Sequence, residues 1–133
     1  MTIAWADLFA VFVVSHLAGD FILQTEFQAL NKHGGLGRDP VRRRALASHT
    51  LTYTACYIPA LVWLAGDGLS AAAVVATALG IGVPHGLQDD GRAMRWWMRR
   101  VKHTEPRPGV LAMAVDQSFH LVALLLLAIV VGV

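Results

Sequence analysis

The sequence predicts an all-α polytopic membrane protein in which four transmembrane helices form an antiparallel bundle. Of the 133 residues, 56% are hydrophobic, which is too large a share for an ordinary soluble domain. Four apolar segments are each about as long as a spanning helix, which needs roughly 20 residues. Their approximate bounds are 3–24, 45–65, 69–90 and 110–132. We therefore expect one domain, residues 1–133, embedded in a lipid bilayer.

The distribution of basic residues predicts the orientation of these spans. All 11 Lys and Arg residues lie in two segments, 32–44 and 92–107. Cytoplasmic loops carry an excess of Lys and Arg, so we expect both segments in the cytoplasm and both termini outside. Four spans return the chain to its starting side, which agrees with this orientation.

The start of the first span carries no basic residue, so we do not expect this span to be a cleaved signal peptide.

The first two spans are joined by a loop. Residues 31–40 are rich in glycine and predict that this connection is flexible. The second span contains Cys56, and a single cysteine excludes an internal disulfide. Pro59 and Pro84 lie within the second and third spans, where membrane helices tolerate proline.

Residues 91–102 predict a short helix on the inner membrane surface. Apolar side chains recur there at helical spacing, and basic side chains fill the other faces. Such a helix is attracted to anionic lipid head groups. A simple topology signal without a specific ligand explains the segment equally well.

Strongly polar residues inside the spans follow one recurring pattern, a His and an Asp four residues apart. This spacing brings two side chains onto one helix face. Imidazole and carboxylate together are a ligand set for divalent metals, and ionisable groups within a membrane usually have a function. The candidate metal ligands are His16, Asp20, His49, His85, Asp89, Asp116 and His120.

These seven residues are expected to meet at one depth. In the predicted topology all of them fall in about the cytoplasmic half of the bilayer. Four His and three Asp exceed what one tetrahedral zinc ion uses, and the number suits two divalent ions bridged by a carboxylate. Zn²⁺, Mn²⁺ or Fe²⁺ is expected. Gln24, Gln88 and Gln117 lie beside the ligands and are expected to hydrogen-bond to them.

The pattern favours a metal-dependent hydrolase that acts on a phosphoester or ester, either a small molecule or a lipid-linked substrate. A bound divalent ion would acidify a water molecule and so supply a nucleophile. Asp20, Asp89 and Asp116 are the candidate catalytic residues, and Arg92 and Arg95 are the candidate substrate-binding residues. Two alternatives remain open: a carrier that binds metal ions or protons, and a haem-binding cytochrome. A nucleic-acid partner is not expected.

Other polar residues near the candidate ligands have a simpler interpretation. Asp90 follows Asp89 but faces about 100° away on a helix, so we expect it to be solvated. His33 and His103 lie in the basic loops, so we expect both at the protein surface.

Four short blocks resemble one family of small bacterial and phage membrane proteins, domain of unknown function 3307. The blocks are HLAGDFILQ at 16–24, SH at 48–49, PHGLQD at 84–89 and DQSFH at 116–120. The pattern that they form extends from residue 16 to residue 120 and so over nearly the whole chain. That family is similar in turn to the LexA-regulated, membrane-bound metal-dependent hydrolases, whose name implies metal-assisted hydrolysis. The resemblance implies that the seven His and Asp residues are ligands and that the protein lies in the bacterial cytoplasmic (inner) membrane.

Overall fold

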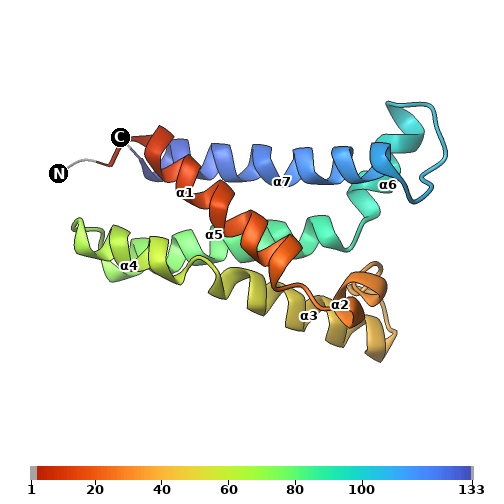
Figure 1. Ribbon diagram of the computed structural model, residues 1–133, viewed down its shortest axis with the longest axis horizontal. Helices are drawn as coiled ribbons and strands as arrows, with labels where there is room; N and C mark the ends of the chain where they lie inside the picture. Colours follow the sequence, from red (N-terminus) through yellow and green to blue (C-terminus); the bar gives the residue numbers. More distant parts are fainter. Residues whose placement is uncertain (1–2, 133) are drawn as a thin grey trace.

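The computed structural model describes residues 3–132, which form α-helices and one π-helical turn without any β-strand, so the all-α prediction is confirmed. The elements are α1 (Trp5–Leu17), η1 (Ala18–Ile22), α2 (Glu26–Asn31), α3 (Pro40–Ala55), α4 (Ile58–Gly66), α5 (Ala71–Asp89), α6 (Arg92–Arg100) and α7 (Val110–Val131). Figure 1 shows α5 and α7 running along the long axis and α1 crossing obliquely, with α2 and α6 both at one end. The start of α1 and the end of α7 lie at the opposite end.

The first pass of the chain through the bundle consists of α1 and η1, and it changes from α-helical to π-helical geometry near its end. The α-helix α1 gives way to the π-helical turn η1, and such turns occur frequently at functional sites. Gly19 in this turn lies against α3, because a Cβ there would stand only 2.7 Å from Tyr53 Cδ2. The neighbouring Asp20 is buried. The π-turn therefore brings a carboxylate close to α3.

The connection between the first two passes is more ordered than its glycines predict. Helix α2 begins with a capping box, in which the Thr25 hydroxyl accepts from Gln28 N and the Gln28 side chain accepts from Thr25 N. In the loop that follows, Gly34 N donates to Asp90 O at 2.9 Å, and Leu36 N donates to Asp90 Oδ1 at 2.8 Å. The loop is thus tied to the end of α5.

The prediction that Asp90 is solvated is wrong, because its side chain is fully buried beneath this loop. Gly91 adopts a left-handed conformation with φ of 77°, which a residue without a Cβ tolerates. This turn folds the chain after α5 so that the Asp90 carboxylate accepts a loop N–H and pairs with Arg92.

The predicted second span consists of two helices. Helix α3 starts at Pro40, before the predicted boundary, and Asp39 caps it by accepting from the N–H groups of Val41 and Arg42. The helix ends at Ala55, and α4 follows with Pro59 in its first turn, where the missing N–H of proline is tolerated. Within residues 3–132, three helical segments are long and apolar enough to cross a membrane: Trp5–Ile22, Ala71–Asp89 and Val110–Val131. A fourth span is not confirmed, because α3 and α4 have 16 and 9 residues and each is too short to cross a membrane alone.

The third and fourth passes and the short surface helix form close to their predicted bounds. Helix α5 continues through Pro84, and α7 extends over the last apolar segment. Helix α6 buries Met98 and packs the Trp97 ring edge-on against Phe119 of α7, with centroids 5.5 Å apart. Its arginines Arg92, Arg99 and Arg100 remain exposed.

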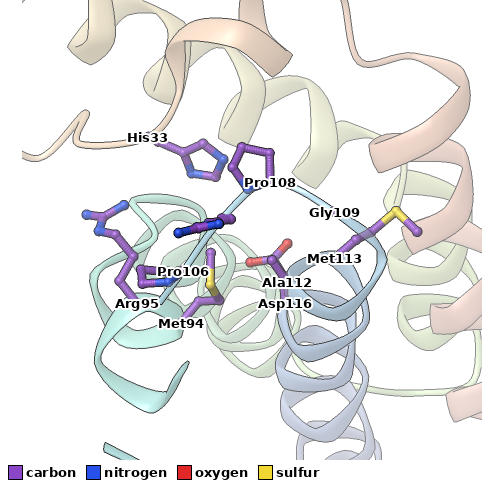
Figure 2. A pocket seen from close by; sticks show the side chains of 10 residues that line it. His33, Met94, Arg95, Pro106, Pro108, Gly109, Ala112, Met113 and Asp116 are labelled. Carbon is purple, nitrogen blue, oxygen red and sulfur yellow. The ribbon is translucent and has the colours of Figure 1, made fainter. Parts of the chain in front are cut away.

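An apolar core fills the half of the bundle near α4. Its buried members from the long helices include Phe12, Tyr53, Ile81 and Leu124. In each helix a candidate ligand lies one turn from the core residue, toward the end with α2 and α6; the pairs are Phe12 with His16, Tyr53 with His49, Ile81 with His85 and Leu124 with His120. At that same end a cavity opens beside Asp116 (Figure 2).

Candidate metal centre

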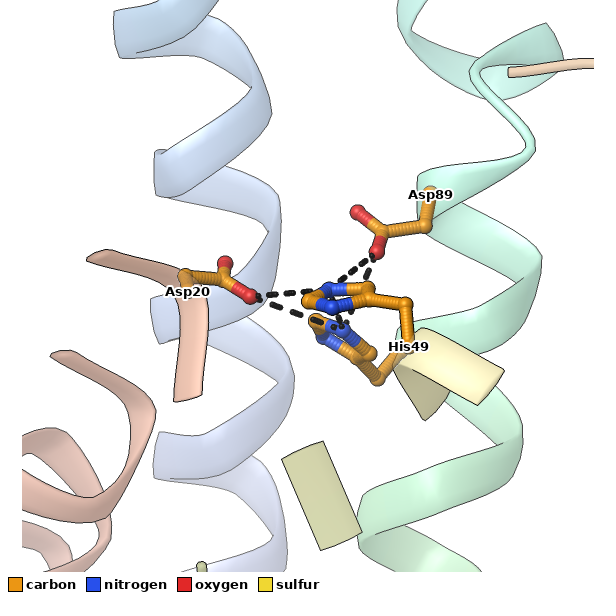
Figure 3. Close-up of side chains that lie close together, drawn as sticks. Asp20, His49 and Asp89 are labelled. Atoms are coloured by element: carbon orange, nitrogen blue, oxygen red, sulfur yellow. Dashed lines mark hydrogen bonds and ion pairs between the residues drawn. The ribbon is translucent and has the colours of Figure 1, made fainter. Parts of the chain in front are cut away.

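Four of the predicted ligands from three elements converge on one point. Asp20 comes from η1, His49 from α3, and His85 and Asp89 from α5. All four are buried. Figure 3 shows the Asp20 and Asp89 carboxylates directed at the ring of His49 from two sides. Long-range packing therefore assembles residues that are far apart in the sequence.

The separations between the ligand atoms resemble those around a metal ion. They are 3.2 Å for His49 Nε2–Asp20 Oδ1, 2.9 Å for His49 Nε2–Asp89 Oδ2, 3.1 Å for His85 Nε2–Asp89 Oδ2, 3.6 Å for His85 Nε2–Asp20 Oδ1 and 3.1 Å for His49 Nε2–His85 Nε2. A tetrahedral zinc ion with ordinary bond lengths holds its ligand atoms roughly 3.3–3.6 Å apart. The observed distances overlap this range and extend slightly below it.

Hydrogen bonding among the four side chains alone does not satisfy these atoms. A histidine Nε2 carries either one proton or one lone pair. His49 Nε2 nevertheless faces Asp20, Asp89 and His85 at once. Asp20 Oδ1 and Asp89 Oδ2 have no hydrogen bond of good geometry among residues 3–132. Such a convergence of acceptor atoms is what a bound cation requires.

A second group shares one residue with the first. Asp89, Asp116 and His120 also lie within reach of a common ion. His120 Nε2 is 3.4 Å from Asp89 Oδ1, whereas Asp89 Oδ2 faces His49 and His85. The two oxygens of Asp89 thus face different groups, so this carboxylate would be able to hold an ion of each group.

His16 is not a member of either group. Its Nε2 lies 2.8 Å from Gln117 Oε1, and its Nδ1 lies 3.0 Å from the Tyr53 hydroxyl. Gln117 Nε2 donates to Asp20 Oδ2 at 3.4 Å, so its Oε1 accepts from His16 Nε2. His16 Nδ1 then accepts from Tyr53. This chain of hydrogen bonds orients the Asp20 carboxylate.

The other two predicted glutamines differ in what they contact. Gln24 Oε1 accepts a hydrogen bond from Lys32 Nζ at 2.8 Å, so it reaches the centre only through the lysine. Gln88 Nε2 donates to the backbone oxygen of Phe119 at 3.2 Å and joins α5 to α7.

Lys32 is a residue of the centre that sequence reasoning missed. Its side chain is buried, and its Nζ lies 3.0 Å from Asp89 Oδ2 and 3.3 Å from His49 Nε2. In the sequence it belongs to a basic loop, and no spacing relates it to the His and Asp pairs. Only the fold of the loop after α2 brings its ammonium group to the carboxylates.

Tyr53 was also missed, although the sequence contains a signal for it. Its ring stacks on the imidazole of His85, with centroids 3.3 Å apart and an interplanar angle of 5°. Its hydroxyl lies 2.6 Å from that of Tyr57. Tyr53 follows His49 by four residues, the spacing that places both on one face of α3. The stacking fixes the plane of the His85 ring.

The two candidate substrate-binding arginines occupy different environments. Arg92 Nε pairs with Asp90 Oδ2 at 3.0 Å, at the surface beyond the centre. Arg95 Nη2 donates to Asp90 O at 3.4 Å, and its side chain lines the same cavity as Asp116. Figure 2 shows Arg95 and His33 beside this cavity.

With its imidazoles neutral, which is the form that binds a metal ion, the centre has an excess of negative charge. Asp20, Asp89 and Asp116 contribute carboxylates, while Lys32 is the ammonium group that lies among them within residues 3–132. An uncompensated buried carboxylate is costly. A divalent cation would offset this cost, and the donor set of imidazole nitrogen and carboxylate oxygen suits Zn²⁺, Mn²⁺ or Fe²⁺.

Comparison with known proteins assigns the chain to a family. No curated protein and no solved structure matches it, so the similarity to LexA-regulated hydrolases is not shown. The model of the family described as "Protein of unknown function (DUF3307)" matches residues 8–133, a range that includes all seven predicted ligands. This protein therefore belongs to the DUF3307 family.

Proposed function

We propose that this protein is a membrane-embedded, metal-dependent hydrolase with two divalent ions bound between its helices. The observation that carries the proposal is the convergence of Asp20, His49, His85 and Asp89 at distances typical of metal ligands. Asp20, His49, His85 and Asp89 would hold one ion, and Asp89, Asp116 and His120 the other. When bound, such ions polarise a phosphoryl or carbonyl oxygen and acidify water.

The surrounding residues prepare the site for this chemistry. The hydrogen bonds from His16 through Gln117 hold Asp20 in place, and stacking on Tyr53 holds His85. The apolar core that contains Ile81 and Leu124 closes the centre on the side of α4. A fixed ligand geometry with water excluded from one side is what a hydrolytic metal site needs.

The membrane arrangement belongs to the same proposal. Helices α3 and α4 together would form the fourth span, because α4 is wholly apolar and the arginines of α3 lie at its first turn. The basic loops would lie in the cytoplasm and both termini outside the inner membrane. Helix α6 would rest on anionic lipid head groups.

The two alternative functions fit the geometry less well. A carrier needs access from both sides of the membrane, yet the bundle beyond Tyr57 is packed with apolar side chains such as Leu8 and Leu64. In a cytochrome, two histidines face each other across the haem iron, whereas His49 and His85 place their nitrogens side by side at 3.1 Å.

Metal content per chain tests the proposal directly. The protein would be purified in mild detergent, without chelators or a His-tag, and reconstituted with Zn²⁺, Mn²⁺ or Fe²⁺. We expect about two ions in the wild type, about one in Asp116→Asn, and almost none in Asp89→Asn, because Asp89 is common to both groups. Asp7→Asn, at the exposed start of α1, is the matched control.

The same samples would be assayed against soluble phosphate esters and carboxylic esters. Hydrolysis should fall with metal content, and circular dichroism should show that each variant keeps its helices. A wild type that binds none of the three metals, or an Asp89→Asn variant that retains hydrolysis, would refute the proposal.

A further inference from the structure

One cavity joins the candidate metal centre to the surface. It has a volume of about 340 Å³ and lies between α6, the loop before α7 and the first turns of α7. Asp116 lines it, and Figure 2 shows this carboxylate directed into the space among the cavity side chains. A second cavity that touches His85 and His120 measures only about 10 Å³, which is room for about one water molecule. Of the two cavities that touch predicted ligands within residues 3–132, the larger is wide enough to admit a substrate.

The polar walls of this cavity are basic apart from Asp116. Arg95, Arg107 and His33 line it. Arg107 takes part in no ion pair within residues 3–132, whereas Arg92 pairs with Asp90 and Arg99 pairs with Glu105. Helix α7 also begins here without a side-chain cap, so its first N–H groups add a positive potential. These groups suit an anion.

The remaining walls are apolar and suit a hydrocarbon part of the ligand. They are formed by Met94, Ala112 and Met113 with the rings of Pro106 and Pro108. A cavity that is basic at one part and apolar at another fits an amphiphilic molecule with an anionic group.

We propose that this cavity binds the phosphate group of an amphiphilic phosphate ester, with Arg107 and Arg95 as the residues that hold it. A guanidinium group matches phosphate with two parallel hydrogen bonds. This inference rests on the proposed function, because the Asp116 carboxylate alone repels an anion. A divalent ion bound by Asp116 reverses the sign of the local charge. Phosphate binding therefore requires the metal.

Calorimetric titration of inorganic phosphate into the zinc-loaded protein, in neutral detergent, tests the inference. We expect binding at one site per chain, weakened at least about tenfold in Arg107→Gln, since a hydrogen bond to a charged group contributes about 1.5–3 kcal/mol. Arg107 is exposed, so its replacement leaves the fold intact. Arg38→Gln, in the exposed loop before α3 and outside the cavity, should bind phosphate as the wild type does.

Metal content measured on the same samples separates the possible failures. Zinc-loaded protein that binds no phosphate, or an Arg107→Gln variant with unchanged affinity, overturns this inference and leaves the proposed function standing. Protein that takes up none of Zn²⁺, Mn²⁺ and Fe²⁺ removes both.

Competition with phosphatidate in mixed micelles identifies the source of the phosphate group. Displacement of inorganic phosphate by phosphatidate supports a lipid head group as the ligand. Binding of inorganic phosphate without such displacement supports the phosphate subsite but overturns the amphiphilic part of the proposal, and it assigns the site to a water-soluble ester.

Discussion

His49 Nε2 has more polar neighbours than one nitrogen satisfies by hydrogen bonding. Asp20, Asp89, His85 and Lys32 all place an atom within 3.3 Å of it. Three of these neighbours are themselves predicted ligands, and the fourth is a cation. A site that gathers acceptors around one point and already contains an ammonium group has the electrostatics of a cation-binding centre.

Lys32 yields a prediction about metal affinity. Its ammonium group lies 3.0 Å from Asp89 Oδ2, so it repels a divalent ion and competes with that ion for the carboxylate. We expect Lys32→Met to bind Zn²⁺ about tenfold more tightly, a change of about 1.4 kcal/mol. The metal-free variant should lose about 3 kcal/mol of stability, because the carboxylates lose their cation.

Zinc titration and thermal unfolding of the metal-free and zinc-loaded forms measure both effects. Lys102→Met, which removes an exposed lysine after α6, is the control and should change neither. Equal zinc affinity in Lys32→Met and the wild type would show that the ammonium group does not compete with the metal.

The residues of the site differ in how far the sequence reveals them. The spacing of four within a helix is enough to identify Asp20, His85 and Asp89, because helix geometry alone determines which side chains share a face. The same rule fails for Lys32 and Asp90. The positions of both side chains depend on how the loop between α2 and α3 folds against the end of α5. No regular spacing in the sequence indicates that packing.

At the scale of elements, the long apolar passes were predictable and the interruptions were not. Hydrophobic length predicts α5 and α7 closely. The π-turn η1 and the division between α3 and α4 depend on local backbone hydrogen bonds that composition does not report. The capping box at Thr25 was visible as a Thr followed three residues later by Gln, and this motif would have predicted α2.

The contact between α3 and α5 depends on two glycines. A Cβ on Gly82 would stand 2.7 Å from Thr54 Oγ1, and one on Gly86 would stand 3.1 Å from Thr50 Oγ1. Small residues spaced by four allow membrane helices to approach closely. The approach matters for the site, because His49 lies on α3 and His85 on α5.

We expect Gly82→Val to push these helices apart, which lowers both thermal stability and zinc affinity. The affinity should fall about tenfold or more, because a displaced ligand weakens a metal site as the loss of an outer hydrogen bond does. Zinc titration beside a melting curve measures the two together. Gly66→Val is the control, since a Cβ at Gly66 would meet nothing within 4 Å. Unchanged zinc affinity in Gly82→Val would mean that the glycines do not position the ligands.

At the scale of the whole molecule, α1 with η1, α3 with α4, α5 and α7 each form one pass along the bundle, while three segments within residues 3–132 meet the length and apolarity of a membrane span. The pass that does not meet them is α3 with α4. Its basic start and apolar end suit one membrane crossing from the cytoplasm outward. If it did not cross, the loop before α3 and the turn after α4 would lie on one side of the membrane.

Two positions distinguish these topologies. Arg38 lies in the loop before α3 and Asp67 in the turn after α4. Cys56 is the one cysteine of the chain, so Cys56→Ser provides a background without thiols. Arg38→Cys and Asp67→Cys would then be labelled separately in intact cells and in opened membranes, with a maleimide that does not cross the bilayer. We expect Asp67→Cys to react in intact cells and Arg38→Cys to react only after the membrane is opened. Reaction of both positions under the same condition would leave three spans, and the His49 side of the centre would then lie outside the bilayer.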